Sequence, residues 1–492
     1  MVFLQTVLYL TVLYGVYIFT RSYYNAFHGP LSKYPGPILR GFSTLPSLWS
    51  KYHGNEVAEI VKLHARYGPV VRIGPTSLSY TNGATAWKDI YGFKRAGKLN
   101  FPKDPEVMTK PLNGSPHIII ANDEIHARQR KIMSHSFADR SIRELEPMLI
   151  GWVSKLVEKL AQPAATSTPA DMLKWYNCAT FDIMADLSFN EPLGMLDDGE
   201  YSPWVGIIFA TIKSLARLRA IRNINWITQS LVSRLMLMPS VQKKAWEHFS
   251  YAAERVDRRL EKPTDRPDLW GKIIDNGGLT RDEQHSNAMI FMTAGTETTA
   301  TLLSGTTYWL LREPAILAKL VAEIRSAFTS VNDMTLENLA RLKYLDAVMH
   351  EGLRMYPPVP TALPRVVPEG GAEVCGDFLP AGVSVGVPQY AAYHSPLNFK
   401  DPDSFRPQRW MGDVEFKDDQ LAAVEPFHVG PRNCIGKNLA YHEFRLILAA
   451  TLLHYDLSLC EASADWTDQK VYILWEKKPL WCTLKPNPAL KA

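Results

Sequence analysis

The hydrophobic pattern of the chain begins with a long apolar run. Residues 2–20 carry no charged side chain and are rich in Leu, Val, Ile, Phe and Tyr. A membrane-spanning helix needs ~20 such residues, so the run predicts a signal-anchor. A cleaved signal peptide is the alternative, but its apolar region is shorter, at ~7–15 residues, and follows basic residues. Here Arg21, Lys33 and Arg40 come after the run, which predicts that the rest of the chain lies on the cytosolic side.

The helical pattern is strongest over residues 279–312. Thr280 followed by Glu283 is a capping box, and a proline follows the end of the run. Helical spacing places one set of residues on a single face, namely Asn287, Phe291, Ala294, Thr298, Leu302 and Gly305. In the middle, Ala294 and Gly295 either open a groove beside the backbone or let another helix pack closely, with the nearby threonines bonded to their own helix.

Shorter patterns predict the remaining elements. Residues 342–356 follow helical spacing and end at two prolines, and residues 122–131 open another helix. Beyond Thr361, stretches of β-favouring residues such as 366–367, 383–385 and 481–484 are separated by Gly and Pro turns. The pattern therefore predicts a mainly α protein with small β-sheets.

Composition narrows the class of protein only a little. The 492 residues are 46% hydrophobic and 21% charged, with a formal net charge of +4. Length alone suggests two or three domains, although no repeat or low-complexity tract divides the chain. The basic residues are scattered, so no nucleic-acid partner is indicated.

The most informative segment is residues 427–436, Phe-His-Val-Gly-Pro-Arg-Asn-Cys-Ile-Gly, which fits F-x-x-G-x-R-x-C-x-G. It predicts a thiolate, Cys434, in a tight loop before a helix. Glycines on both sides allow positive φ and the close approach of a flat ligand, and amides near a helix N-terminus lower a thiol pKa. A buried structural thiol, half of a disulfide or a zinc ligand are the alternatives. The five cysteines are scattered without a C-x-x-C pair, which argues against zinc and a disulfide scaffold.

This loop resembles the haem-ligand loop of the cytochrome P-450 superfamily, the haem-thiolate monooxygenases. The resemblance implies that Cys434 is the axial ligand on the iron of haem b, where a thiolate favours O–O cleavage. Residues 294–299, Ala-Gly-Thr-Glu-Thr-Thr, are similar to the family motif Ala/Gly-Gly-x-Asp/Glu-Thr-Thr/Ser. By that similarity Thr298 hydrogen-bonds the bound oxygen and Glu297 helps to relay protons to it. The fold implied is the cytochrome P-450 fold with an N-terminal transmembrane anchor.

The resemblance also assigns supporting residues. Glu351 and Arg354, three apart on one helix face, match a structural ion-pair motif whose third member is Arg409, in Pro-Gln-Arg-Trp at 407–410. Gln408 stands where the family often has Glu, and His126 where it usually has Trp. The residues expected to bind the haem propionates are His126, Arg130, Arg365 and Arg432. The substrate-pocket candidates are Phe291, Ala294, Val359, Thr361 and Leu363, and the expected lids are residues 104–120 and 204–226.

The expected organisation has three parts. Residues 1–20 are the transmembrane signal-anchor, residues 21–40 a basic, proline-rich hinge that contains the stiff segment 33–37, and residues 41–492 the haem-thiolate monooxygenase domain. The hinge, the basic run 126–131 and the segment 363–371 look like fungal members of the family that act in secondary metabolism. That likeness implies a single-pass protein of the endoplasmic reticulum membrane.

The reaction implied is insertion of one oxygen atom of O₂ into an apolar small molecule, a polyketide or terpenoid intermediate by the fungal likeness. Electrons are expected from NADPH through a separate flavoprotein reductase, for which Arg128, Lys131 and Lys437 form a candidate docking patch. The alternatives are a haem-thiolate isomerase or dehydratase that works without O₂, and a non-enzymatic haem-binding sensor. The intact Glu297-Thr298 pair argues against both.

Overall fold

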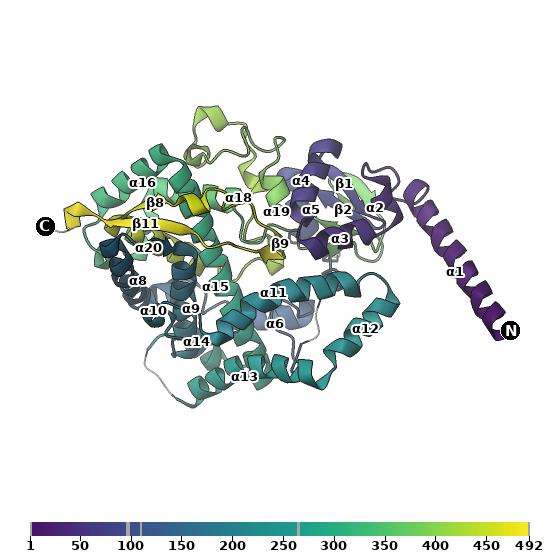
Figure 1. The fold of residues 1–492 in the computed structure, drawn as a ribbon, viewed down its shortest axis with the longest axis horizontal. Helices are drawn as coiled ribbons and strands as arrows, with labels where there is room; N and C mark the ends of the chain where they lie inside the picture. Colours follow the sequence, from purple (N-terminus) through teal and green to yellow (C-terminus); the bar gives the residue numbers. More distant parts are fainter. Residues whose placement is uncertain (1, 95–98, 109–110, 263–265, 491–492) are drawn as a thin grey trace.

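Figure 1 shows a helical body with small sheets and one helix that stands away from it. This computed structural model describes residues 2–94, 99–108, 111–262 and 266–490. The mainly α fold with small sheets that the sequence predicts is confirmed. The helices that precede the central one are α2 (Ile38–Phe42), α3 (Leu45–His53), α4 (Glu56–Tyr67), α5 (Gly83–Tyr91), α6 (Asp123–Met133), α7 (Asp139–Glu144), α8 (Glu146–Thr166), α9 (Met172–Phe189), α10 (Met195–Asp198), α11 (Pro203–Arg222), α12 (Trp226–Met236), α13 (Pro239–Glu261) and α14 (Leu269–Asn276).

The helix that stands away from the body is α1 (Val2–Phe27), which has no buried residue. It is long and apolar enough to cross a membrane. It continues seven residues past the expected end of the anchor at Thr20, because a charge such as Arg21 does not end a helix. Gly29 and Pro30 follow the observed end, and these residue types do end helices. The link between α1 and α2 is therefore shorter than residues 21–40.

Arg72 of strand β1 (Val70–Gly74) connects the end of α1 to the body. Its buried guanidinium group donates to the carbonyl oxygens of Asn25 at 2.9 Å and Ala26 at 3.3 Å, which lie in the last turn of α1. It also donates to the carbonyl of Pro75 at 2.8 Å. Carbonyls in the last turn of a helix have no partner within the helix, so Arg72 satisfies groups that would otherwise need water.

In the part of the chain that the structure describes, the strands form four small sheets. The largest has the order β1-β2-β7-β4 and pairs β2 with β7 in parallel, its other neighbours being antiparallel. Strands β8 and β3 flank β11, and β5–β6 and β9–β10 form two-stranded pairs. The sequence analysis placed strands only after Thr361, so it missed β1, β2 and β3. The strands are β1 (Val70–Gly74), β2 (Ser77–Tyr80), β3 (Ala170–Asp171), β4 (Arg365–Val366), β5 (Ala372–Val374), β6 (Asp377–Leu379), β7 (Ser384–Gly386), β8 (Tyr455–Leu459), β9 (Val471–Tyr472), β10 (Leu474–Trp475) and β11 (Trp481–Pro486).

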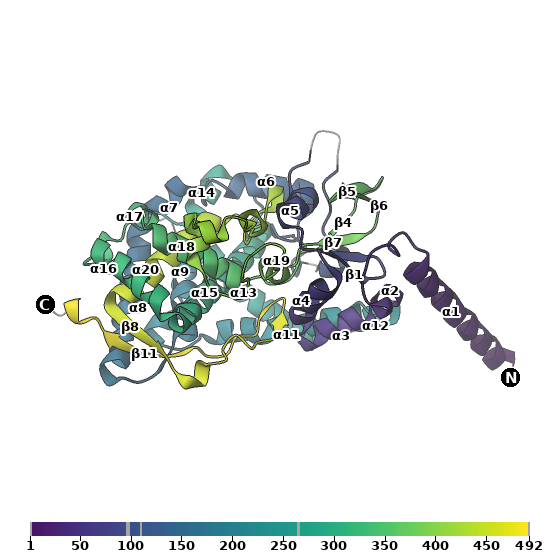
Figure 2. The ribbon, with the colours of Figure 1, turned by 90° about the horizontal axis from the view of Figure 1, so that it is seen from above.

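The central helix is α15 (Arg281–Arg312), which runs through the middle of the body in Figures 1 and 2. Thr280 and Glu283 form the capping box that the sequence predicts. Helix α15 packs against α9, α13 and three helices that follow it, α16 (Pro314–Ala327), α18 (Lys343–Met355) and α20 (Lys437–His454). A Cβ at Gly295 would lie 2.9 Å from the sulfur of Met184 on α9, so this glycine permits close helix packing. The helices after α15 are α16 (Pro314–Ala327), α17 (Leu336–Ala340), α18 (Lys343–Met355), α19 (Gln389–Tyr393) and α20 (Lys437–His454).

Candidate active site

The loop that carries Cys434 has a tightly constrained backbone. It includes a short 3-10 turn, Gly430–Arg432, and leads into α20. Gly430 has φ of 76°, and a Cβ there would lie 2.0 Å from the carbonyl oxygen of Tyr91, so only glycine fits. Gly436 has φ of −86°, so the positive φ expected on both sides of the thiol occurs on one side only. The Cys434 amide donates to the carbonyl of Phe427 at 2.8 Å, which closes the loop.

Opposing effects act on the pKa of the Cys434 thiol. Burial raises its pKa, while a hydrogen bond from the Gly436 amide and the charges of Arg130 and Lys437 oppose that rise. The lowering expected from nearby amides is therefore present but is outweighed by burial. The residue still keeps exposed surface, so one side of it is open to a ligand. The five cysteines are all free thiols.

A cavity of about 520 Å³ lies next to this loop. Its lining includes Asn433, the residue directly before Cys434 in the sequence. Both terminal nitrogens of Arg130 donate to Asn433 at 2.5 Å, one to the carbonyl and one to the side-chain oxygen. Arg432 donates to the carbonyl of Ala121 at 2.8 Å and pairs with Asp123 at 2.5 Å. The lining is Phe93, Asn100, Asp123, His126, Ala127, Arg130, Lys131, Ser134, Gly430, Pro431, Arg432 and Asn433.

Cations crowd this part of the molecule. Burial and the charges of Arg432 and Arg365 lower the pKa of Lys103 to about 7. Burial, with the charges of Arg432, Arg130 and Lys103, lowers the pKa of His126 to about 4. Arg365 is 7% exposed on β4. Neighbouring cations disfavour one another's charged forms, and an anion bound among them would relieve this repulsion.

The residues that the sequence analysis assigned to the propionates thus lie together, and Lys103 joins them. Sequence reasoning missed Lys103 because it belongs to no motif. It reaches the cluster through a single β-bridge to Arg365, more than 250 residues further along.

The middle of α15 is accessible, although most of the residues around it on this helix are buried or half-buried. Ala294 is exposed and Thr298 is half-buried, whereas their neighbours Thr296, Glu297 and Thr299 are buried. The hydroxyl of Thr298 donates to the carbonyl of Ala294 at 2.6 Å. Helix α15 packs against α20, which follows directly from the Cys434 loop. Cys434 and the Glu297-Thr298 pair therefore come from two adjoining elements.

Glu351, Arg354 and Arg409 meet in the protein interior. Their side chains are 0% exposed. The guanidinium of Arg354 binds the Glu351 carboxylate through two contacts, at 2.8 and 2.9 Å, and Arg409 lies 3.4 Å from the same carboxylate. Asp419 also pairs with Arg409, and Trp410 donates to Glu351 at 2.9 Å.

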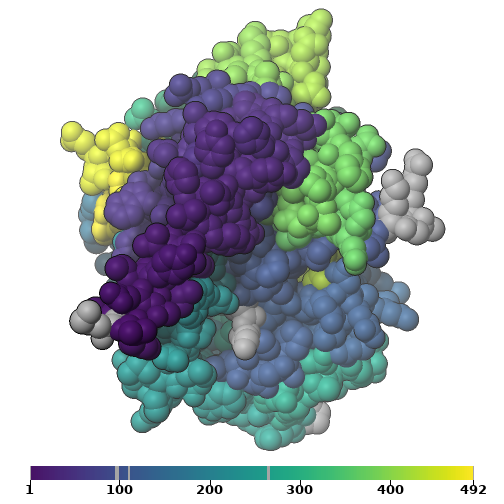
Figure 3. Space-filling model, turned by 90° about the vertical axis from the view of Figure 1, so that its right-hand side faces the viewer, coloured from purple at the N-terminus to yellow at the C-terminus, as the bar shows by residue number. Residues whose placement is uncertain are grey.

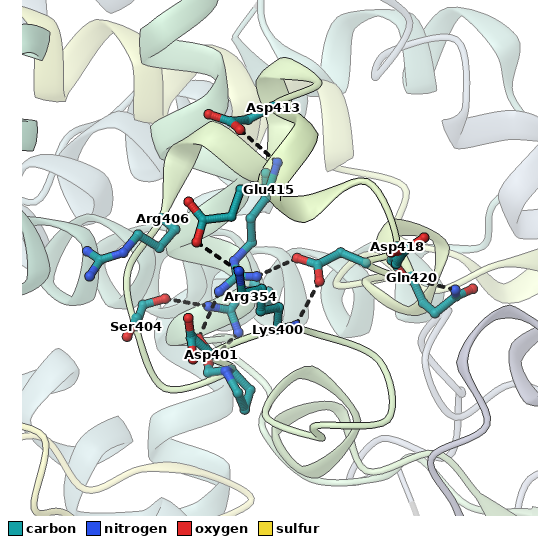
Figure 4. A network of polar contacts seen from close by, with 12 residues as sticks. Arg354, Lys400, Asp401, Ser404, Arg406, Asp413, Glu415, Asp418 and Gln420 are labelled. Carbon is teal, nitrogen blue, oxygen red and sulfur yellow. Dashed lines mark hydrogen bonds and ion pairs between the residues drawn. The ribbon is translucent and has the colours of Figure 1, made fainter.

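This network extends to the loop that bears Cys434. Arg354 donates to the carbonyl of Ser404 at 3.0 Å, within the segment from Lys400 to Gln420 that Figure 4 shows. It also donates to the carbonyl of Tyr393 at 2.9 Å. The hydroxyl of Tyr393 accepts a hydrogen bond at 2.9 Å from the amide of Glu425, two residues before the loop begins. Hydrogen bonds therefore connect the ion pairs to the backbone that leads into the loop.

The substrate-pocket candidates differ in accessibility. Ala294 and Leu363 are exposed and Val359 and Thr361 half-buried, whereas Phe291 is 6% exposed and packs against the rings of Phe137 and Trp270. The two expected lid segments contact each other, since Arg222 of α11 donates to the carbonyl of Glu106 at 2.8 Å. Residues 109–110 of the first lid lie outside the described residues.

These residues fit a haem. Within the described ranges, no group of three or more His, Cys, Asp and Glu side chains is placed to hold a metal ion. A haem iron needs only one such ligand, and Cys434 offers a thiol with one open side. The cation cluster, which also contains the acid Asp123, suits two propionates because guanidinium groups bind carboxylates well.

Comparison with known proteins gives a consistent answer. The profile of the cytochrome P-450 family matches residues 35–483. The cytochrome P-450 monooxygenase efuB of Hormonema carpetanum is 48% identical over 96% of this chain and 95% of its own. The monooxygenase astJ of Aspergillus oryzae is 43% identical over 95% and 94%. Averantin hydroxylase of Dothistroma septosporum is 39% identical over 96% and 90%. The chain therefore belongs to the cytochrome P-450 family of haem-thiolate oxidoreductases.

Proposed function

We propose that this protein is a monooxygenase that hydroxylates or otherwise oxidises an apolar small molecule with O₂. The observation that carries the proposal is the combination of the Cys434 loop with Glu297 and Thr298 on the helix that packs against α20. A thiolate loop alone would also suit a sensor or an isomerase. An acid and a hydroxyl beside it are what a reaction that consumes protons requires.

Each side chain of the site would have a separate role. When bound, haem b would supply the centre that takes up electrons and activates O₂. Cys434 would be its thiolate ligand, and His126, Arg130, Arg365 and Arg432 would hold its carboxylates. In the structure the Thr298 hydroxyl proton points at the Ala294 carbonyl, so the lone pairs of Oγ1 can accept a hydrogen bond from water. Glu297 would pass protons from water toward Thr298.

Electrons would come from NADPH through a separate flavoprotein reductase. Of the basic residues expected to dock it, Lys131 and Lys437 are exposed. Arg128 pairs instead with Glu283 of the α15 capping box. The docking face that we propose therefore consists mainly of Lys131 and Lys437, which precede and follow the Cys434 loop in the sequence.

The substrate that we propose is a polyketide or terpenoid intermediate of a fungal secondary-metabolite pathway. Relatives across the whole chain come from fungi, and one of them is named for hydroxylating averantin. The exposed surface of Ala294 and Leu363 would offer an apolar contact for such a molecule.

The direct test is oxygen uptake by the membrane-bound protein with reductase and candidate pathway intermediates. A monooxygenase consumes O₂ in step with NADPH and forms an oxidised product. A product formed without O₂ or NADPH would favour the isomerase or dehydratase. Haem binding without any turnover would favour the sensor.

Replacing Thr298 by alanine should uncouple the reaction. Removing Oγ1 leaves haem binding and substrate affinity nearly intact, so NADPH and O₂ are still consumed. A positioned proton donor contributes ~10²–10⁴ in rate, so the ratio of product to NADPH should fall at least several-fold while hydrogen peroxide rises. Thr298→Ser should restore most of the coupling.

Thr293→Ala is the matched control for this variant. Thr293 lies on the same helix and its hydroxyl is bonded back to the Met289 carbonyl at 3.3 Å, as that of Thr298 is to Ala294. A product-to-NADPH ratio equal to that of the wild type in Thr298→Ala would remove the relay role and leave Thr298 as a packing residue.

We propose that the protein is held in the endoplasmic reticulum membrane by α1, with its catalytic body in the cytosol. Arg21 follows the apolar run and is exposed. Lys33 pairs with Asp377, and the buried Arg40 pairs with Glu59, so these two cations belong to the folded body. Figures 1 and 2 place α2, α3 and α12 at the end of the body from which α1 emerges, and Figure 3 looks onto that end. Exposed apolar side chains on these elements and the segment after α12 are Ile38, Leu39, Leu45, Trp49, Trp226, Ile227, Leu231, Leu235, Leu237 and Met238.

Deleting residues 1–24 should release only part of the protein from membranes. Burial of one large apolar side chain contributes ~1.5–3 kcal/mol, so the exposed surface near α12 should retain a fraction in a sedimentation assay. Adding Trp226→Glu, Ile227→Glu and Leu231→Glu should release the rest. Val414→Glu is the control, because Val414 is 78% exposed on a separate 3-10 turn. Complete release by the deletion alone would contradict lipid contact at α12, and loss of the haem spectrum would place α1 in the folded core.

A further inference from the structure

A buried ion pair joins α15 to the C-terminal part of the chain. The Nζ atom of Lys477 pairs with Oε1 of Glu297, and the two side chains are 5% and 4% exposed. Nζ also donates to the hydroxyl of Thr301 at 2.7 Å, and that hydroxyl donates to the carbonyl of Glu297 at 2.6 Å. Lys477 therefore binds the acid both directly and through the next turn of its helix. No motif of the sequence pointed to this lysine.

The backbone around Lys477 is fixed on both sides. Before it, the indole nitrogen of Trp475 donates to the carbonyl of Pro357 at 2.8 Å. After it, the carbonyl of Lys478 accepts a hydrogen bond from Trp466 at 2.7 Å, and the amide of Leu480 donates to Asp171 at 2.8 Å. The ammonium group is thus held in place by the body of the protein.

The two carboxylate oxygens of Glu297 are in different situations. Oε1 is held by Lys477, whereas Oε2 has no hydrogen-bond partner among the described residues although it is buried. An unpaired buried oxygen is costly unless it has a use. Oε2 is therefore the atom that is available to accept a proton from water and give it up again.

We propose that Lys477 is a positioning residue for proton delivery: it holds Glu297 by one carboxylate oxygen, so that the other stays free to take up a proton from water and release it. This inference rests on the proposed monooxygenase function. The other titratable groups that face Glu297 are Tyr356 at the end of α18 and Tyr201 before α11. Burial, with a contribution from the charge of Glu297, raises the phenol pKa of both, so they stay neutral and do not replace Lys477 as the counter-charge.

The test compares the product-to-NADPH ratio in five variants, including Glu297→Gln alone and combined with Lys477→Met. Lys477→Met should lower it by ~10-fold to ~10²-fold, the loss typical of a displaced catalytic group, while haem incorporation persists. Lys477→Arg, which keeps the charge, should retain most of the coupling. Lys478→Met is the control, because this exposed neighbour loses the same charge. Adding Lys477→Met to Glu297→Gln should cause no further loss, since the lysine acts through the acid.

A second readout needs no turnover. In Lys477→Met the buried carboxylate of Glu297 loses its counter-charge, so this variant should be less stable than the wild type. Adding Glu297→Gln removes the uncompensated charge. The melting temperature of the double variant Glu297→Gln/Lys477→Met should therefore lie above that of Lys477→Met.

The outcomes separate the two proposals. A wild type that makes no product with NADPH and O₂ refutes the monooxygenase function, whatever the lysine variants do. An active wild type with normal coupling in Lys477→Met overturns the role of Lys477 alone. Losses in Lys477→Met and Glu297→Gln that multiply in the double variant also overturn it, because they show independent effects. If Lys477→Met does not fold but the double variant does, the pairing of Lys477 with Glu297 stands, and the coupling in Lys477→Arg decides. A product-to-NADPH ratio near that of the wild type supports the role of Lys477, and a ratio that falls although the charge is kept contradicts it.

Discussion

Replacement of Cys434 by histidine should abolish the red-shifted Soret band that we expect of the reduced wild-type protein with CO. That band is expected only when a thiolate is the ligand opposite CO, because the thiolate donates electron density to the iron. An imidazole is a neutral ligand and does not. The effect is all-or-none, and an absorbance spectrum of the reduced protein with and without CO measures it.

Cys460→Ser is the matched control, since Cys460 is a free and half-buried thiol outside the loop. It should keep the band. If Cys434→His does not bind haem at all, Cys434→Ser provides a second variant, and it too should lack the band. A red-shifted band that survives in either variant would show that another cysteine binds the iron.

Removal of Arg354 should cause the largest loss of stability of any substitution considered for this chain. Breaking a buried ion pair by removing one partner costs about 3–5 kcal/mol, because the other charge stays buried without compensation. Arg354→Ala also frees the carbonyl of Tyr393, whose hydroxyl holds the amide of Glu425 before the Cys434 loop. We therefore expect a lower free energy of unfolding together with poor haem incorporation, measured by denaturant titration and by the haem-to-protein absorbance ratio.

Arg341→Ala is the control for Arg354→Ala. Arg341 pairs with Glu337 on the surface, where the side chains are 71% and 60% exposed, and such pairs contribute at most ~1 kcal/mol. If Arg354→Ala changed the free energy of unfolding as little as Arg341→Ala does, the ion pairs of Glu351 with Arg354 and Arg409 would have no supporting role. Stability that falls while haem incorporation stays normal would separate the ion pairs from the loop.

The family and the mainly α fold could be predicted from short motifs because these record local chemistry. The capping box of Thr280 and Glu283 and the Cys434 loop each depend on residues within one or two turns of chain. The close packing of Gly295 against Met184 was one of two readings left open, since sequence spacing does not tell which helix covers a glycine. The amides near the helix N-terminus predict a lower pKa for the Cys434 thiol. Burial raises this pKa instead, and burial depends on the whole fold.

Long-range partners could not be predicted. Lys477 stands 180 residues from Glu297, and Lys103 joins Arg365 through one β-bridge. Lysine occurs throughout the chain, and nothing local marks these two. Strand β1 was missed because the charge of Arg72 interrupts its apolar residues, and β2 because its sequence, Ser-Leu-Ser-Tyr, has no β-branched residue.

The contact between Arg72 and the last turn of α1 would link the body to the thickness of the membrane that we propose α1 to cross. The uncharged residues 2–20 at 1.5 Å per residue make about 28 Å of apolar helix, which matches a hydrocarbon core of ~30 Å. In a thinner bilayer this apolar stretch would be too long and the helix would tilt. Because Arg72 binds the carbonyls of Asn25 and Ala26, the body must turn with the helix. A thinner or thicker bilayer would thus rock the whole catalytic body and change which of its apolar faces meets the lipid.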